Sequence, residues 1–193
     1  MIEVKKADIQ HIEGIIKVCS DGYRATYINT HSFEYIERII SEFYNYDRVH
    51  KEVLHSNDGW NGYFIALEGE KVVGAIGGGL IDKDKGEVFV LYLDPNRRGE
   101  GIGTQLLQVL TELQKSKGAT EQWVSVSKGN MKGIPFYEAR GFQFEKSKTA
   151  LIIMKAKTIF LADIAVIYNV RLNKNKRASS FKKLLLFFTK YQH

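Results

Sequence analysis

The sequence predicts a single α/β domain, and three observations lead to this fold class. Short apolar runs rich in β-branched and aromatic residues, such as residues 88–93, have the composition of buried strands. Other stretches, such as residues 33–43, carry apolar residues at helical spacing. The chain has 193 residues, of which 44% are hydrophobic and 26% charged, as in a soluble globular protein with a sizeable core.

The N-terminal part of the chain predicts one strand followed by helices. Residues 2–7 alternate as a strand does, and Asp8 is the expected N-cap of a helix that Asp21-Gly22 interrupts. The apolar face of this helix comprises Ile9, Ile12, Ile15, Ile16 and Cys19. Ser32 is expected to cap a second helix, whose helical spacing continues beyond a break at Asn45.

A meander of strands comes next. Residues 63–67 and 71–80 form a predicted hairpin, and a second turn at residues 83–86 returns the chain into the strand at 88–93. Three consecutive glycines, residues 77–79, lie inside the second strand. A bulge or bend is favoured there over the close approach of a ligand.

The next segment has the form of an anion-binding turn. The strand at 88–93 ends at Asp94-Pro95-Asn96, since proline cannot donate to a ladder. Gly99, Gly101 and Gly103 then alternate before a helix that ends near Gly118. Such a turn directs backbone N–H groups and the positive end of a helix dipole at one point, which suits phosphate. Neither the dinucleotide fingerprint nor a Walker loop is present.

The turn Arg98-Gly99-Glu100-Gly101-Ile102-Gly103 resembles the R-x-x-G-x-G signature of the GNAT superfamily of N-acetyltransferases. In that family this turn holds the pyrophosphate of acetyl-CoA. A second segment, from Asn130 to Phe142, matches the family pattern N-x-x-G/A-I-x-F-Y-x-x-x-G-F at the family's distance beyond the first. A strand at residues 122–126 lies between the two signatures.

The resemblance covers residues 1–148 and implies the GNAT acyl-CoA N-acyltransferase fold. This is an α/β domain of the α+β type, with a mixed, mostly antiparallel sheet of roughly six to seven strands flanked by helices. It further implies an enzyme that uses acetyl-CoA as co-substrate and moves the acetyl group directly to a primary amine. The acceptor remains open between a small molecule, a peptide and a protein.

Amine acetylation requires removal of a proton from the amine, stabilisation of an oxyanion and protonation of the leaving thiolate. Glu87, at the start of the central strand, is the first candidate for general base through a water molecule, and a solvated strand-end glutamate is the alternative. Tyr137 matches the tyrosine that lies near the CoA sulfur in the family and acts as general acid. Packing of its ring against the sheet is the alternative interpretation.

The resemblance also implies the binding residues. The strands at 88–93 and 122–126 separate in the family, and the pantetheine arm pairs with the backbone between them. The predicted cofactor-binding residues are Leu91, Leu93, Arg98, Gly99, Gly101, Ile102, Gly103, Thr104, Asn130 and Tyr137. Asn130 is alternatively a helix N-cap. The predicted acceptor-binding residues are Tyr23, Tyr27 and Tyr92, and nearby acids leave a polyamine or lysine-like acceptor as one option.

Other classes of protein receive less support from the sequence. The single cysteine, Cys19, excludes an internal disulfide, is expected to be a buried thiol and fits a cytoplasmic location. The five histidines are scattered, so no metal site is predicted. We expect no signal peptide and no membrane span. Nucleic-acid binding is not favoured, because residues 155–193 carry nine Lys/Arg and one acid whereas residues 1–154 are slightly acidic.

The resemblance ends before the C-terminus. We therefore predict a catalytic domain at residues 1–154 and an atypical basic, partly amphipathic tail at residues 155–193. An alternative origin of the tail is a shift of reading frame near Ala150, because a shifted frame can encode a family-like ending. An altered last strand would leave a sheet edge open and permit a homodimer. A longer acyl-CoA donor and a non-catalytic acyl-CoA-binding module remain alternative functions.

Overall fold

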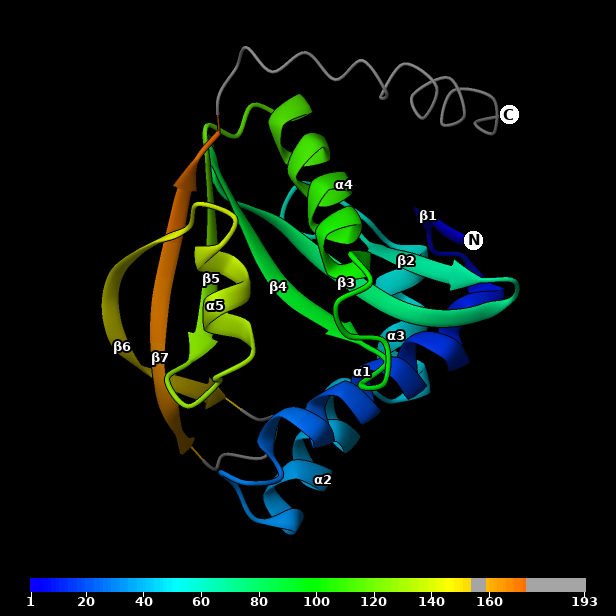
Figure 1. Ribbon diagram of the computed structural model, residues 1–193, viewed down its shortest axis with the longest axis horizontal. Coiled ribbons are helices and arrows are strands. Elements are labelled where there is room, and N and C mark those ends of the chain that lie inside the picture. Colours follow the sequence, from blue (N-terminus) through cyan, green and yellow to red (C-terminus); the bar gives the residue numbers. More distant parts are fainter. Residues whose placement is uncertain (154–158, 173–193) are drawn as a thin grey trace.

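The computed structural model describes residues 1–153 and 159–172. Its centre is a seven-stranded sheet in the order β1-β2-β3-β4-β5-β7-β6, with helices on both faces (Figure 1). The strands are β1 (Ile2–Lys6), β2 (Tyr63–Glu68), β3 (Lys71–Asp82), β4 (Lys85–Leu93), β5 (Glu121–Ser127), β6 (Gln143–Ile153) and β7 (Ile159–Arg171). The helices are α1 (Ile12–Tyr27), α2 (Phe33–Phe43), α3 (Tyr46–Leu54), α4 (Ile102–Ser116) and α5 (Gly133–Glu138), preceded by a short 3-10 helix, η1 (Ile9–His11).

Neighbouring strands of the described sheet run antiparallel everywhere except between β4 and β5. This parallel pair is joined through α4, as a parallel connection requires a crossover segment. The predicted mixed, mostly antiparallel sheet flanked by helices is confirmed. The edge strands are β1 and β6.

Two apolar cores stabilise the sheet, one on each face. The core under α4 includes Leu106 and Leu110, and the core under α1 and α3 includes Ile15 and Val49. Cys19 lies in the second core and is fully buried, which confirms the expected buried thiol. Burial raises the pKa of Cys19, so its sulfur stays protonated and apolar.

The caps of the N-terminal helices agree with the sequence. The side chain of Asp8 accepts from the N–H of Gln10 at 3.0 Å and caps η1. Ser32 accepts from the N–H of Tyr35 at 3.2 Å, and Asn45 accepts from that of Arg48 at 3.0 Å at the break between α2 and α3. These side chains satisfy donors that have no partner inside a helix.

Two details of the predicted first helix are wrong. Asp21-Gly22 does not interrupt α1, which continues to Tyr27, because Gly22 lets the helix approach the sheet closely. A Cβ at Gly22 would lie 2.9 Å from the side chain of Tyr92, so packing offsets the low helix propensity of glycine, about 1 kcal/mol. Ile9 does not join the apolar face and is 62% exposed in η1.

The glycine run in β3 has a structural cause within the protein. The pairing of β3 with β4 shifts between Gly77 and Gly78, where Phe89 of β4 is the extra residue of a bulge. A Cβ at Gly79 would lie 2.0 Å from the carbonyl oxygen of Gly59. The absence of a side chain at Gly79 therefore lets the loop that contains Gly59 pack directly against β3. The predicted bulge is therefore confirmed.

A buried polar network fixes α4 to the sheet just before β4 and β5 separate. Gln114 is fully buried, and its amide nitrogen donates to the carbonyls of Gly79 at 3.2 Å and Glu87 at 3.0 Å. Its oxygen accepts from Gln122 at 2.8 Å, and Gln122 in turn accepts from Thr111 at 2.8 Å. Because every partner is satisfied, the network holds three strands and one helix in register.

The sheet continues past residue 154, where the sequence analysis ended the catalytic domain. Strand β7 is inserted between β5 and β6, and it pairs with β5 from Ser127 and Ala165 to Glu121 and Arg171. Residues 159–171 of the predicted tail therefore belong to the central sheet. The C-terminal part of the predicted basic, partly amphipathic tail, residues 173–193, lies outside the described residues.

Candidate active site

The central strands β4 and β5 separate midway (Figure 1). Residues of both strands line a pocket at this point. They pair from Lys85 and Glu121 to Val88 and Val124, after which β4 stays with β3 and β5 stays with β7. The bulge at Phe89 lies at the point of separation. One edge of β4 therefore faces a pocket of about 430 Å³, and the backbone groups on that edge are directed at it.

The glycine turn forms the end of this pocket beside α4. Gly99 and Gly101 adopt left-handed backbone conformations, with φ angles of 82° and 76°. Gly101 is the N-cap of α4, and its carbonyl accepts from the N–H groups of Thr104 at 3.0 Å and Gln105 at 3.1 Å. The first N–H groups of α4 and the positive end of its dipole therefore lie at the pocket.

Two adjacent arginines of this turn differ in role. Arg97 donates to Glu68 at 2.6 Å and to Glu100 at 2.7 Å, so it ties the turn to the β2–β3 hairpin. These bonds hold the pKa of both carboxyl groups below its usual range. Arg98 is exposed and lines the pocket, and in the described part of the chain it forms no ion pair.

The opposite wall of the pocket is built by α5 and the loop before it. Asn130 lines the pocket, and its side-chain oxygen accepts from the N–H groups of Lys132 at 3.2 Å and Gly133 at 2.7 Å. It thus orders the start of α5, as a helix cap does. The short helix ends before Gly141, whose φ angle is 86°.

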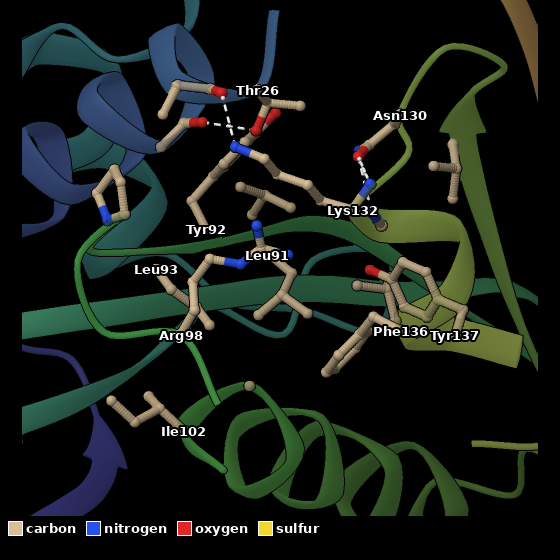
Figure 2. Close-up of a pocket in the computed structure, with 18 of the residues that line it drawn as sticks. Thr26, Leu91, Tyr92, Leu93, Arg98, Ile102, Asn130, Lys132, Phe136 and Tyr137 are labelled. Carbon is tan, nitrogen blue, oxygen red and sulfur yellow. Dashed lines mark hydrogen bonds between the residues drawn. The ribbon is translucent and has the colours of Figure 1, made fainter. Parts of the chain in front are cut away.

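Tyr137 is buried, with 6% of its surface exposed, and its ring packs between Phe136 and Phe142. Figure 2 shows its hydroxyl directed into the pocket. Burial raises the pKa of Tyr137 well above the usual value, because the phenolate is poorly solvated there. The ring therefore packs in the core while the hydroxyl remains a protonated donor.

Sequence analysis missed Arg140, which connects the two helices that flank the pocket. Its guanidinium stacks on the Phe136 ring at 3.7 Å and donates to the Phe136 carbonyl at 2.6 Å. It also donates to the hydroxyl of Thr104 in the first turn of α4. The i,i+4 spacing of Phe136 and Arg140 was the available signal.

The remaining wall comes from α1 and the outer face of β4. Tyr27 and Tyr92 line the pocket, whereas Tyr23 lies behind them, with its ring 4.4 Å from Tyr27 and 6.0 Å from Tyr92. The structure therefore brings two of the three predicted acceptor residues to the pocket. Burial raises the pKa of Tyr92 above its usual value, so its hydroxyl is neutral.

Lys132 spans the pocket from one wall to the other. Its backbone lies at the start of α5, and its Nζ donates to the carbonyl of Ala25 in the last turn of α1 at 3.2 Å. Figure 2 shows this side chain extending from the start of α5 toward Thr26 on α1, above Leu91 in the view. Nothing in the sequence indicated this contact, because it joins residues 107 positions apart.

Glu87 lies just outside the pocket. It is not among the residues that line the pocket in the described structure, but it accepts from the hydroxyl of Ser125 at 3.2 Å. Ser125 lies on β5 and does line the pocket. A proton relay from the pocket to Glu87 would therefore pass through Ser125 or a water molecule.

Within residues 1–153 and 159–172, no three His, Cys, Asp or Glu side chains are grouped as a metal ion would require. The helices of the same ranges are too short or too polar to span a bilayer.

Comparison with known proteins shows the family. Residues 23–142 match the model of the acetyltransferase (GNAT) family, and the chain belongs to this family. The spermidine N(1)-acetyltransferase of Thermoplasma acidophilum is 31% identical over 157 residues, which cover 81% of this chain and 97% of that protein. N-alpha-acetyltransferase 30 of Schizosaccharomyces pombe is 28% identical over 115 residues, covering 55% of this chain and 72% of that protein.

A solved structure agrees with these relatives. The PaiA N-acetyltransferase of Thermoplasma acidophilum, in complex with coenzyme A, superimposes with a TM-score of 0.77 at 26% identity. The alignment covers 89% of this chain and 99% of that one. This protein is therefore a GNAT N-acetyltransferase with the fold of that family.

Proposed function

We propose that this protein transfers the acetyl group of acetyl-CoA directly to a primary amine. The separation of β4 from β5 beside the N-terminus of α4 is the observation that carries the proposal. It supplies an open strand edge for an amide-containing arm and a set of N–H donors for phosphate in one pocket. A neighbouring structure of the same fold is a complex with coenzyme A, which supports this use of the pocket.

In the proposed complex the pyrophosphate binds the backbone of Gly99, Gly101, Ile102, Gly103 and Thr104, while Arg98 adds charge at the rim. The pantetheine arm lies along β4 at Leu91 and Leu93, with Asn130 on its other side. All of these residues line the pocket. This arrangement leaves the thioester between β4 and the hydroxyl of Tyr137.

The proposed chemistry uses one proton acceptor and one proton donor. Glu87 accepts the amine proton through Ser125 or water, because it is one hydrogen bond away from the pocket. Tyr137 protonates the departing thiolate, since its hydroxyl is a protonated donor directed into the pocket. A backbone N–H of β4 near Leu91 stabilises the oxyanion.

For the acceptor we propose a polyamine, such as spermidine. A relative that is 31% identical over nearly its whole length is named for spermidine acetylation. The pocket of this chain places the rings of Tyr27 and Tyr92 on the acceptor side, where they can stabilise a cationic chain.

The test combines acetyl-CoA calorimetry with a free-thiol release assay on spermidine, putrescine, free lysine and a peptide with a free N-terminus. Binding with preferential turnover of the polyamines supports the proposal. Preferential turnover of the peptide overturns the proposal of a polyamine acceptor. Faster turnover with propionyl-CoA than with acetyl-CoA overturns the proposal of an acetyl donor. Binding without thiol release from any amine indicates a non-catalytic module. If acetyl-CoA does not bind, the assignment of the glycine turn fails.

Glu87→Gln tests the proposed base, with Glu70→Gln in the exposed β2–β3 turn as the matched control. We expect kcat to fall about a hundredfold in the first variant, since general-base catalysis contributes about 10² or more. An unchanged kcat in Glu87→Gln would remove this residue from the mechanism and leave the acetyl-transfer proposal in place.

A further inference from the structure

The side chain of Lys132 is itself a primary amine held in the candidate active site. Its Nζ donates to the carbonyl of Ala25 at 3.2 Å, and both residues line the same pocket as Leu91 and Tyr137. Figure 2 shows the Nζ on the α1 side of the pocket, near Thr26. This is the side on which the proposed function places the acceptor amine.

The position of the Nζ has an electrostatic cause. Ala25 lies in the last turn of α1, which ends at Tyr27. The final carbonyls of a helix have no N–H partner within it and carry the negative end of the helix dipole. An ammonium group is therefore stabilised at the Ala25 carbonyl, whether it belongs to a lysine of the chain or to a bound amine.

The loop that carries Lys132 is fixed while its side chain can move. Asn130 accepts from the backbone N–H groups of Lys132 and Gly133, so the start of α5 is ordered. The Nζ, by contrast, is bound to the body of the protein by one hydrogen bond at the end of an exposed, unbranched chain. Rotation of that chain moves the amine within the pocket without displacing the backbone.

From this geometry we propose that Lys132 is an internal acceptor and is acetylated by the protein's own bound acetyl-CoA. The inference rests on the proposed function, because it requires a thioester between β4 and Tyr137. It adds a modification site to the activity on free amines. It also implies that a free acceptor and Lys132 compete for one position at the end of α1.

The reaction balances as a simple acyl transfer. The Lys132 ammonium loses one proton, and the neutral Nζ attacks the acetyl carbonyl carbon. The C–S bond breaks with its electron pair going to sulfur, the attacking nitrogen gives up its second proton, and the thiolate takes up one proton. The products are Nζ-acetyl-lysine, CoA thiol and one net proton, and no oxidant, reductant or further reactant is needed.

The experiment incubates the full chain with acetyl-CoA and follows the intact mass and the acetylated peptides over time. Lys128 provides a matched control, since it is an exposed lysine in the same loop that does not line the pocket. We expect Lys132 to be acetylated at least about tenfold faster than Lys128 at a rate independent of protein concentration. Lys132→Arg abolishes this fast phase, whereas Lys128→Arg preserves it.

Three outcomes overturn the inference. The first is equal acetylation of Lys132 and Lys128 in a preparation that binds acetyl-CoA and turns over a free amine; in that case the proposed function stands alone. The second is a rate that rises with protein concentration, which shows transfer between molecules. The third is equally fast acetylation of Lys132 in heat-unfolded protein. Slower acetylation of Lys132 in the presence of spermidine supports competition between Lys132 and the free acceptor for one position at the end of α1.

Discussion

The two sides of the pocket are built from different parts of the polypeptide. The side beside α4 presents mainly backbone, from Gly99, Gly101 and the open edge of β4. The side beside α1 presents side chains, namely those of Tyr27, Tyr92 and Lys132, which come from three separate elements. A backbone site depends on local conformation, whereas a side-chain site depends on the packing of distant segments. We therefore expect donor binding and acceptor binding to respond to different substitutions.

The largest effect is expected where the two sides meet, at the hydroxyl of Tyr137. Tyr137→Phe should lower kcat about a hundredfold or more, because it removes the proposed general acid and keeps the packed ring. Acetyl-CoA affinity by calorimetry should change little. Tyr168→Phe, which removes another buried tyrosine hydroxyl, one that donates to Glu138 at 3.1 Å, is the control and should retain kcat. Equal losses in both variants would contradict a specific role for Tyr137.

The next largest effect concerns the junction that supports both sides. Gln114→Leu removes the hydrogen bonds to the carbonyls of Gly79 and Glu87 and the acceptor of the Gln122 side-chain amide nitrogen. We expect the free energy of unfolding in urea to fall by about 2–3 kcal/mol, the penalty for unsatisfied buried polar groups. Gln108→Leu, at an exposed position of α4, should change it by less than about 0.5 kcal/mol.

Two glycine variants distinguish an effect on acetyl-CoA binding from the general effect of backbone strain on stability. Gly101→Ala and Gly69→Ala both place a side chain at a positive φ, 76° and 59°, with nothing within 4 Å of the added Cβ. Each should destabilise the fold by about 1–2 kcal/mol, measured by thermal unfolding. Only Gly101→Ala should also weaken acetyl-CoA binding, by about tenfold, because only this strain acts on the turn beside α4. Equal acetyl-CoA affinities would contradict a backbone-based site.

A smaller effect is expected on the acceptor side. Tyr27→Leu should raise the KM for spermidine by about three- to tenfold, which corresponds to a cation–π contribution of about 0.5–1 kcal/mol or somewhat more. The Kd for acetyl-CoA should not change. Tyr46→Leu, at a half-exposed tyrosine of α3 outside the pocket, is the control. A parallel change of both constants in Tyr27→Leu would show that the two sides are not separable.

The smallest effect is an absence of change at alkaline pH. The pKa of Tyr137 is raised by burial, so its acid form persists above the pH of about 10 at which a free tyrosine ionises. Between about pH 8 and pH 10, kcat of the unmodified protein should therefore not fall through ionisation of Tyr137. A decrease with an apparent pKa near 9 that disappears in Tyr137→Phe would contradict the burial of the phenol.

The side of the pocket that we propose for the cofactor could be located from the sequence, because most of its signals are local. The ten residues predicted to bind the cofactor all line the pocket. Eight of them lie in a strand, a glycine turn and a helix that are adjacent in sequence, and the other two, Asn130 and Tyr137, lie in the second signature segment. The caps at Asp8, Ser32 and Asn45 were predictable for the same reason, since each involves neighbours only three or fewer positions away.

The acceptor side was only partly predictable. Tyr23 is separated from the pocket by Tyr27 and Tyr92, and Glu87 is separated from it by Ser125. Lys132 reaches Ala25 across a long sequence separation, which no local pattern encodes. Gly22 looked like a helix break, but its lack of a side chain is what lets α1 meet Tyr92.

The sequence by itself determined the family, the order of most elements and the backbone turn that faces the pocket, because glycine spacing and hydrophobic periodicity act over a few residues. Only the tertiary structure decided which side chains share the pocket and where the sheet continues through β7. It also decided that the ammonium of Lys132 lies at the end of α1. These features arise from packing between segments far apart in the chain, where volume, burial and helix-end charges select the partners.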